Sequence, residues 1–352
     1  GAFRLFFFMH QEPSGARIMA YTTIDKPSDH FNTVLYTGNN SSQAITGVGF
    51  QPDWIWLKSR TGTYGAYNPQ AYDSVRGFTT GGDLTPANTN VEGVDSGAHG
   101  YISAVGADGF TLTGGSTNSH QNNGASTTYV AWNWKAGTSF SNDASATSVG
   151  SIDSTGSVST TAGFSIISYT GNNTGGATVA HGLGATPGLI IIKNRDDDSS
   201  AHWAVWHHKA YASAGDPNIV YLQNTAAAAD DTNIRHSSVT TSSTVFSIGD
   251  YNGVNGNGDK IISYCFSEVK GYSKFGKYSG NDNTEGPFVF TGFKPAWLMI
   301  KRAGTEDTSS NMNGSHWVML DNKRDTLNNT GAAKALTANR NNAEDTTNLT
   351  NV

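Results

Sequence analysis

Charge and cysteine are both scarce in this chain. Only 14% of its 352 residues are charged, well below the quarter that is typical of soluble domains. The net charge is −6, and lysine and arginine form no cluster. The basic footprint that nucleic-acid binding requires is therefore missing. The single cysteine, Cys265, excludes a disulfide framework. Because it lies in an apolar segment, a buried inert thiol is favoured over a nucleophile.

Helix-forming runs of Ala, Glu, Lys and Leu are also missing, whereas Gly, Ser, Thr and Asn are abundant. Short β-branched and aromatic runs bounded by Gly, Asn, Asp and Ser predict strands and turns. The expected fold class is therefore all-β, as tandem antiparallel β-sandwich domains. The firmest strand candidates are residues 33–36, 54–58, 128–135, 164–169, 189–193, 260–266 and 296–301.

What the chain does contain is one pattern that occurs three times. A Tyr-(Thr/Ser)-Gly motif begins at Tyr36, Tyr169 and Tyr278, and a proline follows 16, 18 and 17 residues later. In every copy a lysine lies six residues after that proline, at the end of an apolar run. Apolar residues on both faces of this run predict a central strand that is covered on each side. The residues of this repeat signature are Pro52, Trp54, Lys58, Pro187, Leu189, Lys193, Pro295, Trp297 and Lys301.

The copies are too far apart to be propeller blades or solenoid repeats. Their prolines are 135 and 108 residues apart, compared with about 20–50 residues in such repeats. Each copy is therefore expected to be a separate domain with its own core. The predicted division is an N-terminal extension at 1–30, a β-sandwich repeat at 31–136, a Ser/Thr/Gly-rich linker at 137–163, a second repeat at 164–271 and a third at 272–352.

The third copy is predicted to be incomplete. In the first two copies a phenylalanine strand, at 109–112 and 245–248, precedes an aromatic closing strand, at 129–134 and 261–266. The third copy reaches neither strand, so the chain is expected to be a fragment. Residues 1–18 match no part of the repeat, and their apolar run is too short to span a membrane. Upstream translated sequence and a small docking peptide are the two interpretations of that segment.

Candidate metal ligands are better explained by other roles. Adjacent His207 and His208 would point to opposite faces of a strand, which argues against one shared metal. Two Asp-rich loops, at 196–198 and 250–259, contain the carboxylates that calcium prefers. A solvated loop explains the first of them better, and turn geometry explains the Gly and Asn content of the second equally well. We therefore predict no metal ligand and no cofactor.

Carboxylates form no predicted catalytic pair either. Glutamates are few, and none recurs at the same place in different copies, so the two-carboxylate arrangement of glycosidases is not predicted. An Asp-x-x-Arg pattern recurs at 73–76 and 321–324 and indicates local ion pairs or fixed turns, whereas the second copy has His207-His208-Lys209-Ala210 there. The chain has no Ser-His-Asp pattern, phosphate loop or zinc motif. We predict no catalytic residue.

Aromatic residues that follow the central strand are candidates for binding sugars, because sugar rings stack on aromatic faces. The candidates are Tyr64, Tyr67, Trp206 and Tyr211. The competing interpretation is a core role. It is favoured for Trp203 and Trp317, because a tryptophan at the same place in two copies usually fills a sandwich. For Tyr64 and Tyr67 the two interpretations are evenly balanced.

Four segments carry a resemblance to a known family. They are Met19-Ala20-Tyr21-Thr22-Thr23-Ile24-Asp25-Lys26-Pro27, Gly49-Phe50-Gln51-Pro52-Asp53-Trp54-Ile55-Trp56-Leu57-Lys58, Tyr72-Asp73-Ser74-Val75-Arg76-Gly77 and Ala131-Trp132-Asn133-Trp134-Lys135-Ala136-Gly137. They resemble the repeated domains of virion and tail-fibre-like proteins of marine bacteriophages, including those that infect cyanobacteria. The resemblance covers residues 19–352. The second copy departs from it, because Gly184-Ala185 replaces Gly-Phe and Leu189 replaces the first aromatic residue.

The resemblance implies a lectin-like or jelly-roll-like sandwich in a non-enzymatic structural protein of the virion. This protein would be a tail fibre or capsid-surface appendage on the extracellular particle that contributes to host-surface attachment. The implied partners are other virion proteins, further copies of the chain such as a trimer, and a host cell-surface glycan, with neither nucleic acid nor membrane insertion. No heptad seam or collagen-like repeat indicates how a trimer would form. The alternatives left open are a secreted glycan-binding or glycan-cleaving β-sandwich protein and a spacer without any ligand.

Overall fold

The computed structural model describes residues 3–10, 22–61, 67–94, 96–199, 201–210, 218–235, 241–281, 283, 286–304, 314–325 and 334–345. Strands dominate these residues. Helical structure is limited to the 3-10 turn η1 (Pro27–Asp29) and the short helices α1 (Ser96–His99), α2 (Ala144–Thr147) and α3 (Asn252–Asn255). No helix in this part of the chain is long and apolar enough to cross a membrane. The prediction of an all-β fold built from antiparallel sheets is confirmed.

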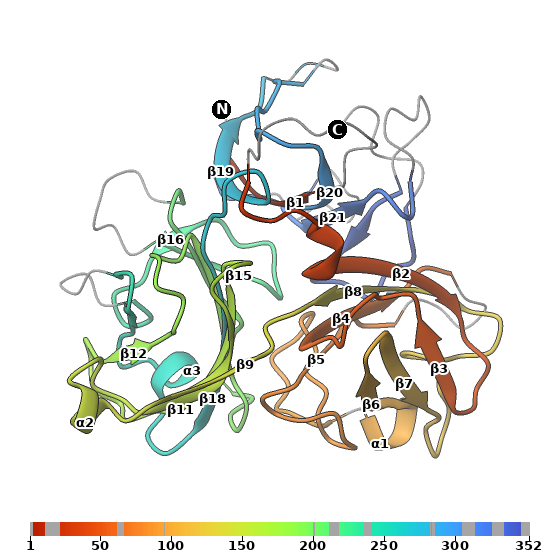
Figure 1. Ribbon diagram of the computed structural model, residues 1–352, viewed down its shortest axis with the longest axis horizontal. Helices are drawn as coiled ribbons and strands as arrows, with labels where there is room; N and C mark the ends of the chain where they lie inside the picture. Colours follow the sequence, from red (N-terminus) through yellow and green to blue (C-terminus); the bar gives the residue numbers. More distant parts are fainter. Residues whose placement is uncertain are drawn as a thin grey trace.

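Three units, one for each copy of the repeat, are arranged around a common centre (Figure 1). The first unit contains β2 (Phe31–Thr37), β3 (Gln43–Thr46), β4 (Trp54–Ser59), β5 (Gln70–Asp73), β6 (Tyr101–Gly106), β7 (Gly109–Thr113) and β8 (Thr128–Trp134). The second contains β9 (Thr138–Asn142), β10 (Ser154–Ser159), β11 (Phe164–Thr170), β12 (Thr178–Ala180), β13 (Leu189–Asn194), β14 (Ala204–His207), β15 (Asn218–Tyr221), β16 (Ala229–Asp230), β17 (Val245–Ser247) and β18 (Lys260–Phe266). The third contains β19 (Ser273–Ser279), β20 (Pro295–Arg302), β21 (Trp317–Asp321) and β22 (Leu336–Thr337), together with β1 (Phe3–His10).

The main sheets of the three units have the same strand order. It is β2-β8-β4-β5 in the first unit, β11-β18-β13-β14 in the second and β19-β1-β20-β21 in the third. The signature strands β4, β13 and β20 lie between equivalent neighbours in the three sheets. Their register is also equivalent, because Trp54 pairs with Trp134, Leu189 with Phe266 and Trp297 with Met9.

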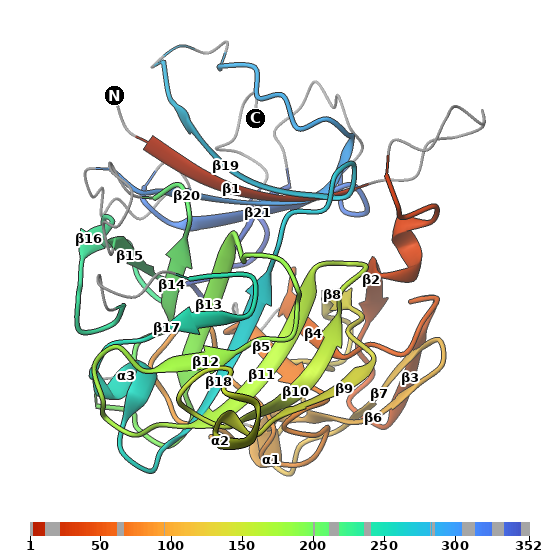
Figure 2. The same ribbon diagram turned by 60° about the vertical axis from the view of Figure 1, so that its left-hand side comes forward.

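Strand β1 closes the main sheet of the third unit. It pairs antiparallel with β19 on one side and β20 on the other (Figure 2), where β8 and β18 lie in the other units. The expectation that residues 1–18 lie outside the repeat architecture is therefore wrong for residues 3–10. Sequence comparison misses this strand because a position in a sheet requires backbone register and apolar character rather than a shared motif.

The segment 137–163, which we expected to be a linker, belongs to the main sheet of the second unit. β10 pairs with β11, and β9 pairs with β10, so the sheet extends to eight strands. Val158 is buried, and Phe140 packs against the same hydrophobic cluster. The linker prediction was wrong because small residues can form strands wherever a neighbouring strand supplies the backbone partners.

A second, smaller sheet covers the outer face of the main sheet in the first two units. It is β3-β7-β6 in the first unit and β12-β17 in the second. The predicted phenylalanine strands occupy equivalent places, because Phe110 pairs with Ile45 and Phe246 with Val179. Each pair of sheets encloses its own hydrophobic cluster and so forms a sandwich.

The Tyr-Thr-Gly motif recurs because it connects the end of the first strand to a neighbouring loop. Tyr36 Oη donates to the Asn122 carbonyl at 2.7 Å, and Tyr169 Oη donates to the Val254 carbonyl at 2.7 Å. The glycines that follow, Gly38 and Gly171, lie so close to the backbone of these loops that an added Cβ would overlap it. The motif thus marks a close backbone approach that only glycine permits.

The inner faces of the three main sheets enclose one shared core. The largest hydrophobic cluster combines aromatic residues of all three units. Trp54 stacks on Tyr264 of the second unit with ring centroids 4.5 Å apart, and Trp134 lies edge-on to Trp297 of the third at 5.4 Å. The expectation of separate domains with independent cores is therefore wrong. Both faces of the signature strand are apolar because one face lies in the unit's own sandwich and the other in this shared core.

The fold predicts that β1 contributes strongly to stability. The backbone of Phe6 is paired with Gly276 and Ile300 on opposite sides, so Phe6→Pro removes an amide inside the sheet. We expect F6P to lower the free energy of unfolding by about 2 kcal/mol or more in urea titrations. The control R4S alters an exposed side chain of the same strand and should have little effect. Equal stability of the two variants would contradict the placement of β1.

Candidate functional site

The lysine of each repeat signature is fully buried. The relative exposure of Lys58, Lys193 and Lys301 is 0%. Each ammonium group donates to a main-chain carbonyl of a neighbouring unit. The three bonds run from Lys58 Nζ to Arg340 O (2.6 Å), from Lys193 Nζ to Thr89 O (3.1 Å) and from Lys301 Nζ to Thr225 O (3.1 Å). The first unit thus contacts the third, the second contacts the first, and the third contacts the second, which makes a closed ring of bonds.

Burial makes two of these lysines weakly basic. It lowers the pKa of Lys58 from 10.5 to about 7, and the nearby charges of Arg340 and Arg324 act in the same direction. Burial also lowers the pKa of Lys193 to about 7, against the opposing effect of Asp197 and Asp198. Such a pKa suits a catalytic base. Because the side chains are inaccessible and bonded to carbonyls, their arrangement supports a structural role instead.

A buried ion-pair network joins the first unit to the second. Arg76 binds Asp73 at 2.5 Å and Glu92 at 2.8 Å, and both Arg76 and Asp73 have fully buried side chains. The second unit contributes Arg195, which binds Glu92 at 2.6 Å, and Tyr264, which donates to Asp73 at 2.7 Å. The Asp-x-x-Arg pattern therefore forms a local ion pair, as predicted, but in the interior at a junction between units.

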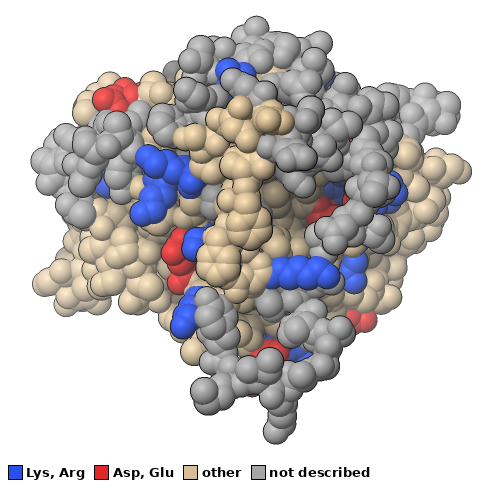
Figure 3. All heavy atoms as spheres, turned by 90° about the horizontal axis from the view of Figure 1, so that it is seen from above, with Lys and Arg blue, Asp and Glu red and all other residues tan. Residues whose placement is uncertain are grey.

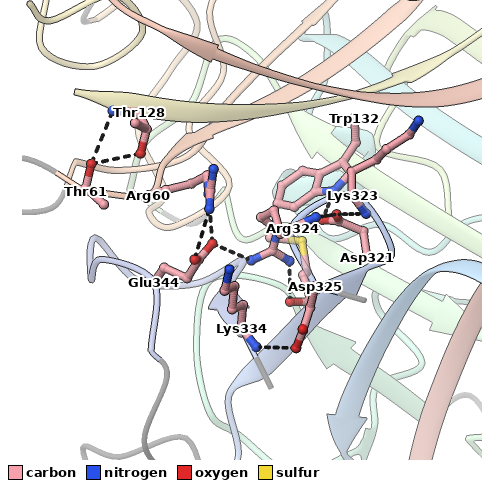
Figure 4. Close-up of polar contacts among 11 residues, drawn as sticks. Arg60, Thr61, Thr128, Trp132, Asp321, Lys323, Arg324, Asp325, Lys334 and Glu344 are labelled. Carbon is pink, nitrogen blue, oxygen red and sulfur yellow. Dashed lines mark hydrogen bonds and ion pairs between the residues drawn. The ribbon is translucent and has the colours of Figure 1, made fainter. Parts of the chain in front are cut away.

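A second network, built in the same way, joins the third unit to the first (Figure 4). Arg324 binds Asp321 at 2.6 Å and Glu344 at 3.3 Å. The first unit contributes Arg60, which binds Glu344 at 2.8 Å, and Trp132, whose indole Nε1 donates to Asp321 at 3.0 Å. Each member has a counterpart in the first network, because both networks combine an Asp-x-x-Arg pair, a glutamate, a second arginine and an aromatic hydrogen-bond donor.

The junction between the second and third units has no such network at the equivalent positions. His207 replaces the aspartate, since it pairs with Leu189 as Asp73 pairs with Trp54. Alanines replace the other charged residues, namely Ala210, Ala228 and Ala303. The main-chain bond between the units is kept, with Ala228 N to Ala303 O at 2.9 Å and Glu92 N to Arg195 O at 3.0 Å. All four charged residues of the network are therefore replaced at this junction.

The predicted sugar-binding aromatics do not gather into one site. Tyr67 is half-buried in the first unit, and its Oη lies 2.7 Å from His120 Nδ1. Trp206 is buried inside the second sandwich, where the guanidinium of Arg235 lies 4.8 Å from its ring centroid. Tyr64 and Tyr211 lie outside the described residues.

The two tryptophans that we assigned to the core do lie there. Trp203 and Trp317 are almost fully buried in the shared core. Their indole nitrogens also donate to carbonyls of a neighbouring unit, at Thr85 (3.1 Å) and Tyr221 (2.8 Å).

A buried cluster of amides adjoins the Tyr67–His120 pair, and the sequence reasoning missed it. Gln70 donates to Gln121 and accepts from Tyr72 Oη at 3.1 Å. Tyr129 Oη donates to the His120 carbonyl at 2.6 Å, which ties this loop to β8. The polar run Asn118-Ser119-His120-Gln121-Asn122-Asn123 was the available signal. Because these amides are buried, only the half-buried ring of Tyr67 offers a face on which a sugar could stack.

The remaining candidates have structural roles. Asp196 accepts from the Lys260 amide at 2.8 Å, and Asp197 from the Ser199 amide at 2.8 Å. Asp259 accepts from Asn194 at 2.7 Å. The described residues contain no group of three His, Cys, Asp or Glu side chains placed to hold a metal ion. Burial raises the pKa of Cys265 to about 12, so this thiol is not a reactive thiolate.

The fold and its junctions define an all-β protein of three units around one core. The chain belongs to the family described as domain of unknown function DUF7483, whose model matches residues 26–352. No curated protein and no solved structure matches the chain. The matched region begins after β1, so the strand that closes the third sheet lies outside the family region.

The buried lysine predicts an unusual pH dependence of stability. Between pH 7 and the ordinary lysine pKa of 10.5, the unfolded chain binds a proton at Lys58 that the folded chain has lost, so stability rises with pH. The variant K58M removes this titration. We expect wild type to gain up to about 1.4 kcal/mol per pH unit relative to K58M between about pH 7 and pH 9, measured by urea unfolding.

The control for this experiment is K294M, because Lys294 is exposed. Its stability difference from wild type should not change with pH. A constant difference between wild type and K58M over the same range would contradict a lowered pKa of Lys58.

The ion-pair network predicts a specific contribution from Tyr264. Removing its hydroxyl in Y264F leaves the buried Asp73 carboxylate with one donor fewer, which should cost about 2 kcal/mol of stability. The matched control is Y272F, because Tyr272 is equally buried but its Oη has no partner among the described residues. Thermal unfolding should show a clear loss for Y264F alone. A similar loss for both variants would mean that the bond to Asp73 is not what matters.

Proposed function

We propose that this chain is a non-enzymatic structural protein of a bacteriophage particle, either a tail fibre or a capsid-surface appendage. Its location would be the surface of the extracellular virion. The observation that carries the proposal is that the buried lysines and both ion-pair networks join the three units to one another. The resemblance of the repeat to virion proteins supports the same role.

A closed arrangement of units suits a protein that must persist outside a cell. Opening any one unit exposes part of the shared core and breaks bonds to both neighbours. Local unfolding is therefore coupled to the whole molecule, which limits the partly open states that proteases attack. Neither disulfides nor metals are required for this form of protection.

Attachment to a host would involve the Tyr67–His120 pair. A half-buried aromatic ring with a polar edge gives one weak sugar contact. Many copies on one particle would turn such contacts into firm adhesion. The partners in this proposal are other virion proteins, further copies of the chain such as a trimer, and a host cell-surface glycan.

The second candidate function is a secreted glycan-binding protein, which would use the same Tyr67–His120 pair. The glutamates at the junctions favour binding over cleavage. A glycosidase needs one carboxylate free to accept or donate a proton at the sugar. Glu92 and Glu344 are instead bound to arginines at the junctions.

Labelling of purified particles distinguishes these functions. Antibodies against residues 164–266 should decorate virions at regular positions in electron micrographs, and peptides of the chain should be found in those particles by mass spectrometry. Detection of the protein only as a free secreted species, in a culture whose particles lack it, would overturn the structural proposal. Y67A particles should adsorb to host cells less well than Y67F particles, which keep the aromatic ring.

A further inference from the structure

In the part of the third unit that the structure describes, an outer segment has no strand like the one that covers its counterparts. Residues 286–293 connect β19 to β20, as β3 lies between β2 and β4 and β12 lies between β11 and β13. In the first two units this outer segment pairs with the phenylalanine strand β7 or β17. Among the described residues, none forms a β-bridge with residues 286–291.

Two large apolar side chains of this segment point into solvent. The relative exposure of Phe288 is 90% and that of Phe290 is 70%, the highest values among the large apolar residues described. In the counterpart strands β3 and β12, Ile45 and Val179 pair with the phenylalanine strand and are only 5% and 0% exposed. Exposed aromatic residues in a neighbouring pair are unusual on a protein surface and mark an interaction site.

The outer face of the third main sheet is also thinly covered. The buried residues described on this face are Ile300, Val318 and Ala335, and Val289, Phe293 and Leu298 are only partly buried. The equivalent clusters of the other units consist mainly of buried residues. Figure 3 looks onto the third unit and shows a band of uncharged atoms crossing this side of the molecule, with Lys and Arg beside it.

We propose that residues 286–291 and the adjacent sheet face receive an extended strand from a second polypeptide. The strand would run antiparallel to residues 286–291 and carry a phenylalanine with another apolar residue two positions later. Both filled units have this pattern, as Phe110-x-Leu112 and Phe246-x-Ile248. The backbone bonds would give affinity, and the alternate apolar side chains would give specificity.

The third unit already accepts a strand that is distant in the sequence. Its closing position is filled by β1, which comes from the opposite end of the chain and lies outside the family region. A strand therefore need not follow β22 in order to complete this unit. In the proposed virion, such a strand would join the chain to a neighbouring protein. The role of the site in assembly therefore rests on the proposed structural function.

The test uses the full chain and a labelled peptide with the sequence of residues 107–115, which contains the phenylalanine strand of the first unit. We expect saturable binding in a fluorescence anisotropy titration. Binding should be at least about tenfold weaker for the peptide with F110S and for the protein variant F288S/F290S. The control variant V94S removes another exposed apolar side chain and should bind normally.

Hydrogen exchange of the chain alone completes the test. The amides of residues 288–290 should exchange fast without peptide and slowly with it. Slow exchange without peptide would show that this chain covers the segment itself, and the proposal would be overturned. It would also be overturned by absent binding or by equal binding of the F110S peptide. Either result would leave the virion function standing if labelled particles still contained the protein.

Discussion

Each main sheet has two apolar faces, and one of them can be covered only by the other two sheets. This constraint governs the molecule. A unit can bury its outer face in a sandwich of its own, but Trp54, Tyr264 and Trp297 face a centre where three units meet. At about 25 cal/mol for each Å² of apolar surface removed from water, exposing such aromatic residues would be costly. The units therefore fold as one body.

The buried charges follow from that geometry. The signature lysine lies where the central strand reaches the next unit, and carbonyl groups of that unit accept its hydrogen bonds. Breaking one partner out of a buried ion pair is costly because the other charge is left uncompensated. This explains why the second–third junction lacks the whole network rather than one member. At the other two junctions, Trp132 and Tyr264 donate to an aspartate. At the second–third junction the equivalent strand position is Phe7, whose side chain contains no hydrogen-bond donor, and His207 stands in place of the aspartate.

The repeat predicted the equivalence of the three central strands, because an apolar run between a proline and a lysine at constant spacing indicates the same local structure in each copy. It did not predict the partners of those strands. Both faces of 54–57 were recognised as covered, yet periodicity cannot say whether a face meets its own domain or a neighbour. β1 and residues 137–163 were missed for a related reason, because strand pairing is decided by backbone contacts that small or unmatched residues can also make.

The candidate site was predictable only in part. Tyr67 was identified because it is an aromatic residue among turn residues. Its contact with His120 could not be predicted, and neither could the contact between Gln70 and Gln121, because these partners lie on a loop more than 50 residues further along the chain. Trp206 was named as a candidate sugar-binding residue because its position along β14 was not compared with the two faces of the sheet. Its side chain lies inside the sandwich.

Because the three units share one core, we expect that they cannot unfold separately. Differential scanning calorimetry of the full chain should therefore show one unfolding transition, in which the calorimetric enthalpy equals the van't Hoff enthalpy. Two or three resolved transitions, each matching the size of a single unit, would contradict it.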